Sequence, residues 1–293
     1  YGERLDELFA GTPSLGAVRL ALVHSMTSES HKIMVMDVKC AFLYGEARRT
    51  VYIELPHTDP RYGDPTVVGK LKKSMYGTRD APQIWAEHVR TTLASLGYKQ
   101  SAYQPSVYFH PEKSVLIVVH VDDFLCTGRS KELEELHRNL AEKYELKKTM
   151  LSLEDERETK NLNRVLRVTN EGVEIVGDPK HSEILFKDWG VTEHSKEVNT
   201  PSLKELEIKV ASGEELGADM ATKVRRSIAR VNYMAQDRPD LSAVAKTMSQ
   251  HMAKTHEGVV PLLKRCVKYL KRFPAASLLV PRGVPAEIGR AHV

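Results

Sequence analysis

The stretch VLIVVHVDDFLCT, residues 115–127, sets two adjacent aspartates, Asp122 and Asp123, inside a run of apolar residues. Val, Ile and Leu favour strands, so the stretch predicts a hairpin buried in a sheet with both acids at its turn. Two carboxylates about 4 Å apart repel each other by roughly 4 kcal/mol at an effective dielectric constant of 20. Such a site takes up a proton or binds a cation, and a divalent metal is the simpler answer.

A third acid, Asp37, ends an apolar run in IMVMDVKCAFLYGE, residues 33–46. Three carboxylates at neighbouring strand ends can hold two Mg²⁺ ions, with Mn²⁺ as a substitute, and such ions clamp both oxygens of a phosphoryl displacement. The pattern indicates polymerase or nuclease chemistry, with Asp37, Asp122 and Asp123 as metal ligands and catalytic residues. Neighbouring strand residues point to opposite faces, so Asp122 and Asp123 are not expected to serve the metals equally.

Four blocks, in this order, resemble the reverse transcriptase of Ty1/copia-type LTR retrotransposons. They are DVKCAFLYGE (37–46), KLKKSMYGTRDAPQIW (70–85), LGYKQSAYQPSVYF (96–109) and HVDD (120–123). Residues 199–201, 229–252 and 262–274 resemble the segment that follows the polymerase core in the same polyproteins, so the resemblance covers nearly the whole chain. It implies an RNA-directed DNA polymerase with an α+β right-hand palm, in which helices pack behind an antiparallel sheet.

The resemblance also implies roles for individual residues. Asp37 and Asp122 would bridge both metals, with Asp123 in a supporting part. Phe42 lies where reverse transcriptases place an aromatic ring that collides with the 2′-hydroxyl of a ribonucleotide. A hydrophobic core role for Phe42 is the alternative.

The second block implies a nucleotide and template pocket formed by Tyr76, Gly77 and Arg79. Gly77 would allow close approach of the backbone, and Arg79 would offer a phosphate a fork of donors. Trp85 is interpreted as a core residue rather than a platform for a base. The chain departs from the family pattern without losing a metal ligand, at Cys40, Tyr44, Thr78, Asp80 and His120. His120 is interpreted as the substitute for an aromatic residue on the primer side.

The formal net charge of +4, with 28% charged residues, is only mildly basic, so nucleic-acid binding has to come from local patches. One patch accompanies the second block and the other lies near the C-terminus; their predicted contact residues are Lys70, Lys72, Lys73, Lys264, Arg265 and Lys268. An ordinary solvated face is the alternative for each patch. The predicted partners are an RNA or DNA template-primer and dNTPs, and phosphate contacts would make the grip salt-sensitive.

Cys40, Cys126 and Cys266 are odd in number and have no CxxC spacing, which argues against a disulfide framework or a zinc site. No apolar run approaches the roughly 18 residues of a membrane span. The resemblance implies a place in a cytoplasmic virus-like particle or the nucleus. It also implies integrase and ribonuclease H, from the same Pol polyprotein, as partners.

Composition shifts and the resemblance divide the chain into four expected parts. These are partial fingers and palm (1–150), a thumb-like region with a linker at 191–217 (151–217), a helical connection segment (218–287) and an adapter-derived tail, IGRAHV (288–293). The start at Tyr1 predicts an internal fragment without ribonuclease H and without the basic fingers strand of the family. Because that strand supplies cations for the triphosphate, the isolated fragment is expected to be weakly active or inactive.

Helices are expected at residues 15–26, 82–97, 179–189, 218–235, 241–253 and 259–273, with a further helix capped by Ser130 and hairpins at 107–121 and 165–176. Strands are expected at 33–37, 51–55 and 67–71. Two other function classes remain open: a metal-dependent nuclease, which would not need Phe42, and a catalytically decayed remnant that only binds nucleic acid.

Overall fold

The computed structural model describes residues 12–274 and 276–283, and the chain forms two compact units. The first contains residues 1–161 and 281–293, and the second residues 162–280. The expected adapter-derived tail lies outside the described residues. Residues 191–217, the expected linker, all belong to the second unit, so they do not separate the two units. The expected boundaries after residues 150 and 217 remain predictions.

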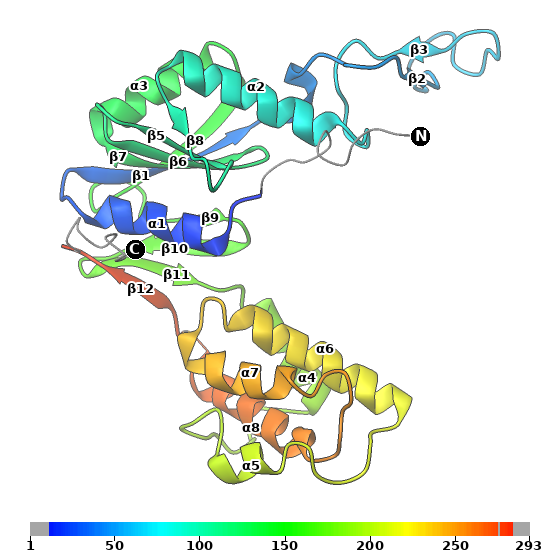
Figure 1. Cartoon of the computed structure of the whole chain (residues 1–293), viewed down its shortest axis with the longest axis vertical. Helices are drawn as coiled ribbons and strands as arrows, with labels where there is room; N and C mark the ends of the chain where they lie inside the picture. Colours follow the sequence, from blue (N-terminus) through cyan, green and yellow to red (C-terminus); the bar gives the residue numbers. More distant parts are fainter. Residues whose placement is uncertain (1–11, 275, 284–293) are drawn as a thin grey trace. The chain divides into compact units, whose positions relative to one another are not determined.

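A six-stranded sheet in the order β4-β5-β6-β7-β1-β8 forms the centre of the first unit. Every neighbouring pair in it is antiparallel. Its strands are β1 (His31–Val38), β4 (Lys99–Gln100), β5 (Val107–His110), β6 (Val115–His120), β7 (Asp123–Arg129) and β8 (Leu146–Leu151). Helices α2 (Ala81–Ser95) and α3 (Ser130–Ala141) cover one face, and α1 (Leu15–Met26) lies on the other (Figure 1). The expected α+β class is confirmed.

Strand alternation divides the apolar residues of β1 between the two faces. Met34, Met36 and Val38 are all 1% exposed or less and pack in one cluster with Trp85 and other residues of α2 and α3. Burying one such side chain stabilises the fold by about 1.5–3 kcal/mol, so this layer holds the sheet and helices together. Ile33 and Val35 alternate with these residues and therefore lie on the other face of the sheet, as does Asp37.

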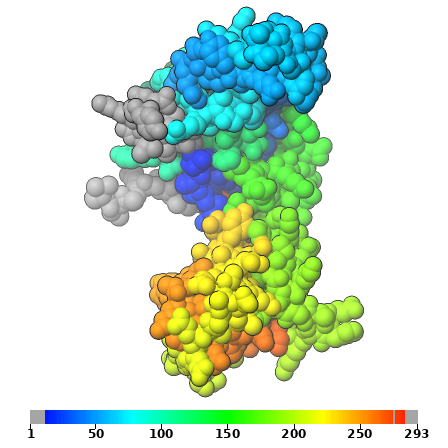
Figure 2. Space-filling model, turned by 90° about the vertical axis from the view of Figure 1, so that its right-hand side faces the viewer, coloured from blue at the N-terminus to red at the C-terminus, as the bar shows by residue number. Residues whose placement is uncertain are grey.

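The segment between β1 and α2 contains the 3₁₀ helix η2 (Ala41–Tyr44) and a two-stranded ladder of β2 (Tyr52–Ile53) with β3 (Gly69–Lys70). Both strands are shorter than the five-residue runs expected from sequence. The intervening loop contains three prolines, which cannot donate to a ladder. This segment, coloured blue to cyan, is exposed on the face shown in Figure 2.

Helix α3 begins at the expected cap residue, one position earlier than predicted. Ser130 is its first helical residue, and Arg129 occupies the cap position without a side-chain hydrogen bond. The Ser130 cap was therefore wrong. Arg129 instead pairs with Glu132 at 3.0 Å between Nη2 and Oε1. The buried face of this helix consists of Leu133, Leu136 and Leu140.

The second unit joins a hairpin to a helical bundle. The hairpin of β10 (Arg164–Val168) and β11 (Gly172–Val176) confirms the sequence prediction, and β12 (Leu278–Pro281) lies beside β11. The helices are α4 (Lys180–Trp189), α5 (Lys204–Ile208), α6 (Ala218–Met234), η3 (Pro239–Leu241), α7 (Ser242–Ser249) and α8 (Val259–Arg272). A short strand, β9 (Glu158–Asn161), ends the first stretch of unit 1.

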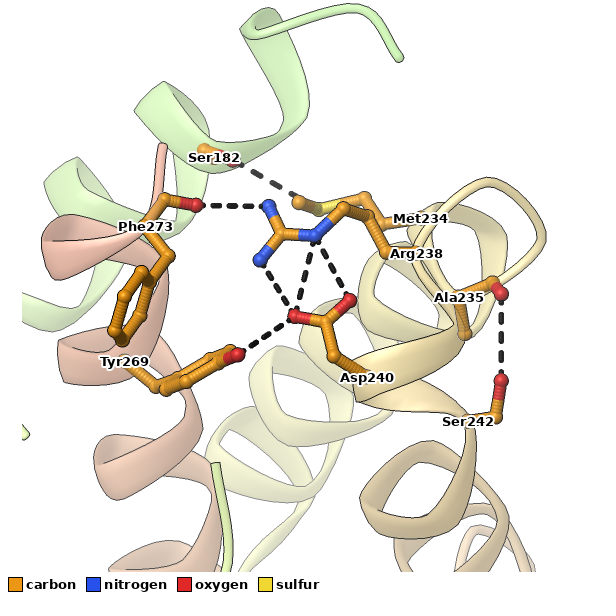
Figure 3. Close-up of polar contacts among 8 residues, drawn as sticks. All are labelled: Ser182, Met234, Ala235, Arg238, Asp240, Ser242, Tyr269 and Phe273. Carbon is orange, nitrogen blue, oxygen red and sulfur yellow. Dashed lines mark hydrogen bonds and ion pairs between the residues drawn. The ribbon is translucent and has the colours of Figure 1, made fainter. Parts of the chain in front are cut away.

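An ion pair between the buried Arg238 and the partly exposed Asp240 links η3 to α8 in this bundle (Figure 3). Arg238 is 5% exposed and its Nη2 lies 2.7 Å from Oδ2 of Asp240. Its Nη1 donates to the carbonyl of Phe273 at 2.9 Å, and the Tyr269 hydroxyl donates to Asp240 at 2.8 Å. The buried Arg238 charge is therefore paired with the Asp240 carboxylate and hydrogen-bonded to the Phe273 carbonyl. A buried charge is tolerated when it is paired in this way.

The first unit also includes a segment from the other end of the chain. Gly283 donates its backbone N–H to the carbonyl of Met26 at 3.0 Å. Residues 281–283 therefore join the unit built by residues before Leu162, although the whole second unit separates them in sequence.

Candidate active site

Sheet register brings two of the three predicted acids together. Asp37 on β1 is the direct partner of Asp123 on β7. Asp122 lies in the turn before β7, and its carbonyl accepts a hydrogen bond from the backbone N–H of Val38 at 3.0 Å. The sequence placed both acids at the turn; the structure makes Asp123 the first residue of the strand.

The backbone conformation of Val121 explains why the turn ends before Asp123. Its φ of 55° is left-handed, which is unusual for a β-branched residue and costs on the order of 1–3 kcal/mol. The indole N–H of Trp85 donates to the Val121 carbonyl at 2.5 Å, and Trp85 itself is 1% exposed. Helix α2 thereby holds the strained turn that precedes Asp122. Trp85 is a buried residue, as expected, but sequence reasoning missed this hydrogen bond.

The three acids influence one another electrostatically. Burial raises the pKa of Asp123, the charges of Asp122 and Asp37 raise it further, and His120 opposes them. His120 is the sheet partner of Asp123 across the hairpin. Asp123 is therefore a carboxylate whose negative charge is under-compensated, which is the environment that favours uptake of a cation.

Within residues 12–274 and 276–283, no group of three or more His, Cys, Asp or Glu side chains is arranged as a ready-made metal site. The chemistry of the three acids nevertheless fits Mg²⁺, which takes carboxylate oxygens and usually retains several waters. Asp37 and Asp123 are sheet partners, and the charges of Asp122 and Asp37 both act on Asp123, so the three acids form one electrostatic cluster.

Phe42 and Tyr76 form one aromatic pair beside these acids. Their ring centroids lie 4.6 Å apart, and the Ser74 hydroxyl donates to the carbonyl of Phe42. Burial raises the pKa of Tyr76, and the charge of Asp122 raises it further. The first and second sequence blocks therefore meet at the acids, although 34 positions separate Phe42 from Tyr76.

The rest of the second block is explained by backbone geometry and charge. Gly77 has a φ of 90°, a conformation that favours glycine, and a Cβ there would meet no protein atom within 4 Å. Asp80, a departure from the family pattern, accepts from the Arg49 guanidinium at 3.2 Å and 3.3 Å. Arg79 is exposed.

Lys147 is a residue that sequence reasoning missed. It lies on β8 directly opposite Asp37, so a cation and an acid are sheet partners at the edge of the site. Opposite charges in this position stabilise a sheet by about 0.2–1 kcal/mol. The signal in the sequence was weak, because Lys147 belongs to a polar, charged strand without a motif of its own.

The two basic patches differ in how far their charges are already engaged. Lys70 and Lys72 are exposed, whereas Lys73 pairs with Glu46 at 2.8 Å. In the second unit, Arg265 donates to the Thr200 hydroxyl at 2.8 Å. Lys264 is exposed and Lys268 half-buried on α8.

The cysteines and helices bear on two further expectations. All three cysteines, Cys40, Cys126 and Cys266, are free, and burial raises the pKa of the Cys266 thiol to about 12. Among the described residues, no helix combines the length and apolar character needed to cross a bilayer.

Known proteins with similar sequences and structures can now be compared with this site. The chain is 26% identical over 295 residues to the retrovirus-related Pol polyprotein from transposon RE1 of Arabidopsis thaliana, covering 97% of this chain and 19% of that protein. It is 25% identical over 286 residues to the Pol polyprotein from transposon TNT 1-94 of Nicotiana tabacum, covering 92% and 20%. The chain thus spans about a fifth of the length of these curated relatives.

Among solved structures, the foamy viral protease-reverse transcriptase in complex with an RNA/DNA hybrid shares 13% identity with a TM-score of 0.45, covering 93% of this chain and 30% of that one. The model of the reverse transcriptase (RNA-dependent DNA polymerase) family matches residues 1–154, more than half of the chain. Reverse transcriptases in general depend on a divalent metal. The family match and the transposon relatives confirm the resemblance of the four motifs, and the chain belongs to the copia-type branch of the reverse transcriptase family.

Proposed function

We propose that this chain is the RNA-directed DNA polymerase part of a copia-type Pol polyprotein and adds deoxynucleotides to a primer 3′-hydroxyl. The observation that carries the proposal is the pairing of Asp37 with Asp123, with the charge of Asp122 acting on the same carboxyl. Clustered acids with a perturbed pKa are typical of catalytic sites.

Asp37 and Asp122 would hold two Mg²⁺ ions, with Asp123 in support. Ions held there supply the charge that lowers the pKa of the primer hydroxyl and stabilises the leaving pyrophosphate. Two hydrogen bonds of the chain position the site. Trp85 donates to the turn before Asp122, and Ser74 donates to the backbone carbonyl of Phe42. Correct placement of reacting groups accounts for much of the rate in such displacements.

Phe42 is proposed as the residue that excludes ribonucleotides, with Tyr76 packed against it. Phe42→Ala is expected to raise the efficiency of ribonucleotide incorporation relative to deoxyribonucleotide by at least about tenfold, because the ring no longer meets the 2′-hydroxyl. The measurement is single-nucleotide extension with dNTP and rNTP in parallel. Leu43→Ala, an exposed neighbour, is the matched control; an unchanged ratio for Phe42→Ala would return the ring to a core role.

Template-primer binding is proposed to use the exposed lysines of the first patch, whereas Arg265 is already engaged within its own unit. Lys70→Ala and Lys72→Ala should each weaken binding of any sequence and lower the slope of log K against log salt by about one. Fluorescence anisotropy of a labelled RNA/DNA hybrid at several salt concentrations measures this. Glu46→Ala frees Lys73 from its ion pair, and the slope should then rise rather than fall.

The polymerase proposal is tested by incubating the chain with Mg²⁺ and a labelled primer on an RNA template, with and without dNTPs. Extension that depends on dNTPs supports it, and shortening of the primer without dNTPs would indicate a nuclease. Binding without either reaction would indicate the decayed remnant. The same assay on the complete polyprotein, with its integrase and ribonuclease H as proposed partners, shows what the rest of the protein contributes.

A further inference from the structure

A cavity of about 180 Å³ lies in the first unit between helix α2 and the strands β5 and β6. Its walls include the apolar side chains of Trp85, Val89, Val119 and Val121. Glu87 and Arg90 of α2, which pair with each other, line it as well. Neither the fold nor the proposed reaction accounts for this space.

One polar group in the cavity has no protein partner. Ser106 is 4% exposed and lines the cavity, yet none of the described residues accepts or donates a hydrogen bond at its Oγ. A buried hydroxyl without a partner costs about 1–3 kcal/mol. The neighbouring amide of Gln100 is already engaged, since it donates to the Pro105 carbonyl at 2.6 Å and the Tyr108 hydroxyl at 3.1 Å.

The size of the cavity limits what it can hold. An apolar cavity of about 150 Å³ accepts a benzene ring, so this slightly larger one accepts a single ring with a small substituent. Mainly apolar walls with a few polar groups, here Ser106, Gln100 and the Glu87–Arg90 pair, are typical of small-molecule sites. The free Oγ of Ser106 calls for a ligand atom that can donate or accept one hydrogen bond.

We propose that this cavity is a binding site for a single-ring aromatic compound with one amide-like group, and that occupancy controls the catalytic turn. Trp85 forms a wall of the cavity and donates to the carbonyl of Val121, which also lines it. Val121 directly precedes Asp122 and holds a left-handed φ. A ligand that pushes on Trp85 or Val121 therefore displaces the turn that positions the acids. This control of extension rests on the proposed polymerase function, whereas binding itself does not.

Binding is measured by ¹⁹F NMR with 4-fluorobenzamide as the probe and fluorobenzene as the probe without the amide. 4-Fluorobenzamide should bind the full chain, and its ¹⁹F resonance should shift under the ring current of Trp85. Ser106→Ala should weaken that binding about fivefold and leave fluorobenzene unchanged. Ala86→Leu fills the cavity from a helical position and should remove binding of both probes.

Thr91→Leu, an exposed substitution on the same helix, is the matched control and should bind both probes like the wild type. Circular dichroism establishes that each variant is folded. Equal binding by wild type, Ser106→Ala and Ala86→Leu would overturn the site. Saturating 4-fluorobenzamide should then slow primer extension several-fold in wild type and not in Ala86→Leu. Bound probe with unchanged extension would overturn the control of the turn, while absence of extension in all samples would count against the polymerase and not against the cavity.

Discussion

Asp122→Asn is expected to reduce primer extension by at least about 100-fold while the chain remains folded. Residues that only orient metal ligands cost 10- to 100-fold when changed, and a direct ligand should cost more. A neutral amide binds Mg²⁺ poorly, and it also removes one of the two charges that raise the pKa of Asp123. The measurement is the rate of single-nucleotide addition on a primed RNA template.

Asp123→Asn should be milder than Asp122→Asn, because Asp123 is proposed to support rather than bridge the metals. Glu145→Gln is a useful control, since Glu145 is an exposed acid of the same unit whose ion pair with Lys39 is on the surface. Its extension rate should match the wild type. Near wild-type extension by Asp122→Asn would show that the proposed metal site is wrong.

Asp240→Ala is expected to destabilise the second unit by about 2 kcal/mol. The substitution leaves Arg238, a residue that is 5% exposed, without its carboxylate partner. Because the Asp240 side chain is 30% exposed, the expected cost is lower than the about 3–5 kcal/mol of a fully buried pair. The hydroxyl of Tyr269 loses its acceptor as well (Figure 3). Hydrogen exchange of the amides of α8 measures the loss within this unit alone. Glu197→Ala, which breaks the exposed pair with Arg272, should cost less than about 1 kcal/mol.

The same network gives the second unit an acid-sensitive stability. Burial raises the pKa of Asp240, but hydrogen bonds from Arg238 and Tyr269 and the Arg238 charge outweigh it, so the net pKa is below 3.8. A carboxyl with a lowered pKa stabilises the folded state above its unfolded pKa, and this contribution is lost as the pH falls through the folded pKa. Unfolding free energies of the second unit should therefore fall below about pH 4 in the wild type, and less in Asp240→Ala. Equal acid sensitivity in both would contradict this assignment.

Local patterns were sufficient to predict most elements of the fold. The apolar runs around Asp37 and Asp122 became β1 and β6, and the three- and four-residue spacing after Pro82 became α2. Sequence patterns did not predict local conformations that depend on a residue far away in the sequence. Nothing in the sequence near Ser130 shows that Arg129 takes the cap position. The apolar runs also do not show that Val121 is left-handed, because its carbonyl is held by Trp85, 36 positions earlier.

The candidate site was predictable to a similar degree. Motif resemblance selected the three acids, Phe42 and Tyr76, and the structure brings Phe42 and Tyr76 into contact. The motif resemblance could not predict the sheet register, in which Asp37 is the partner of both Asp123 and Lys147, because that register depends on three strands at once. The left-handed φ of Gly77 was not predicted, because no motif specifies it, and its role beside a nucleotide stays a prediction.

The route of the chain has a consequence for biosynthesis. Residues 281–283 belong to the first unit, and Gly283 bonds to Met26, yet the ribosome makes them only after every residue of the second unit. Domains generally fold as they emerge, from the N-terminal side first. The palm must therefore wait, without its last segment, while 119 residues of the second unit are synthesised. A stop codon just before Pro281 would leave the second unit whole and the first unit unfinished.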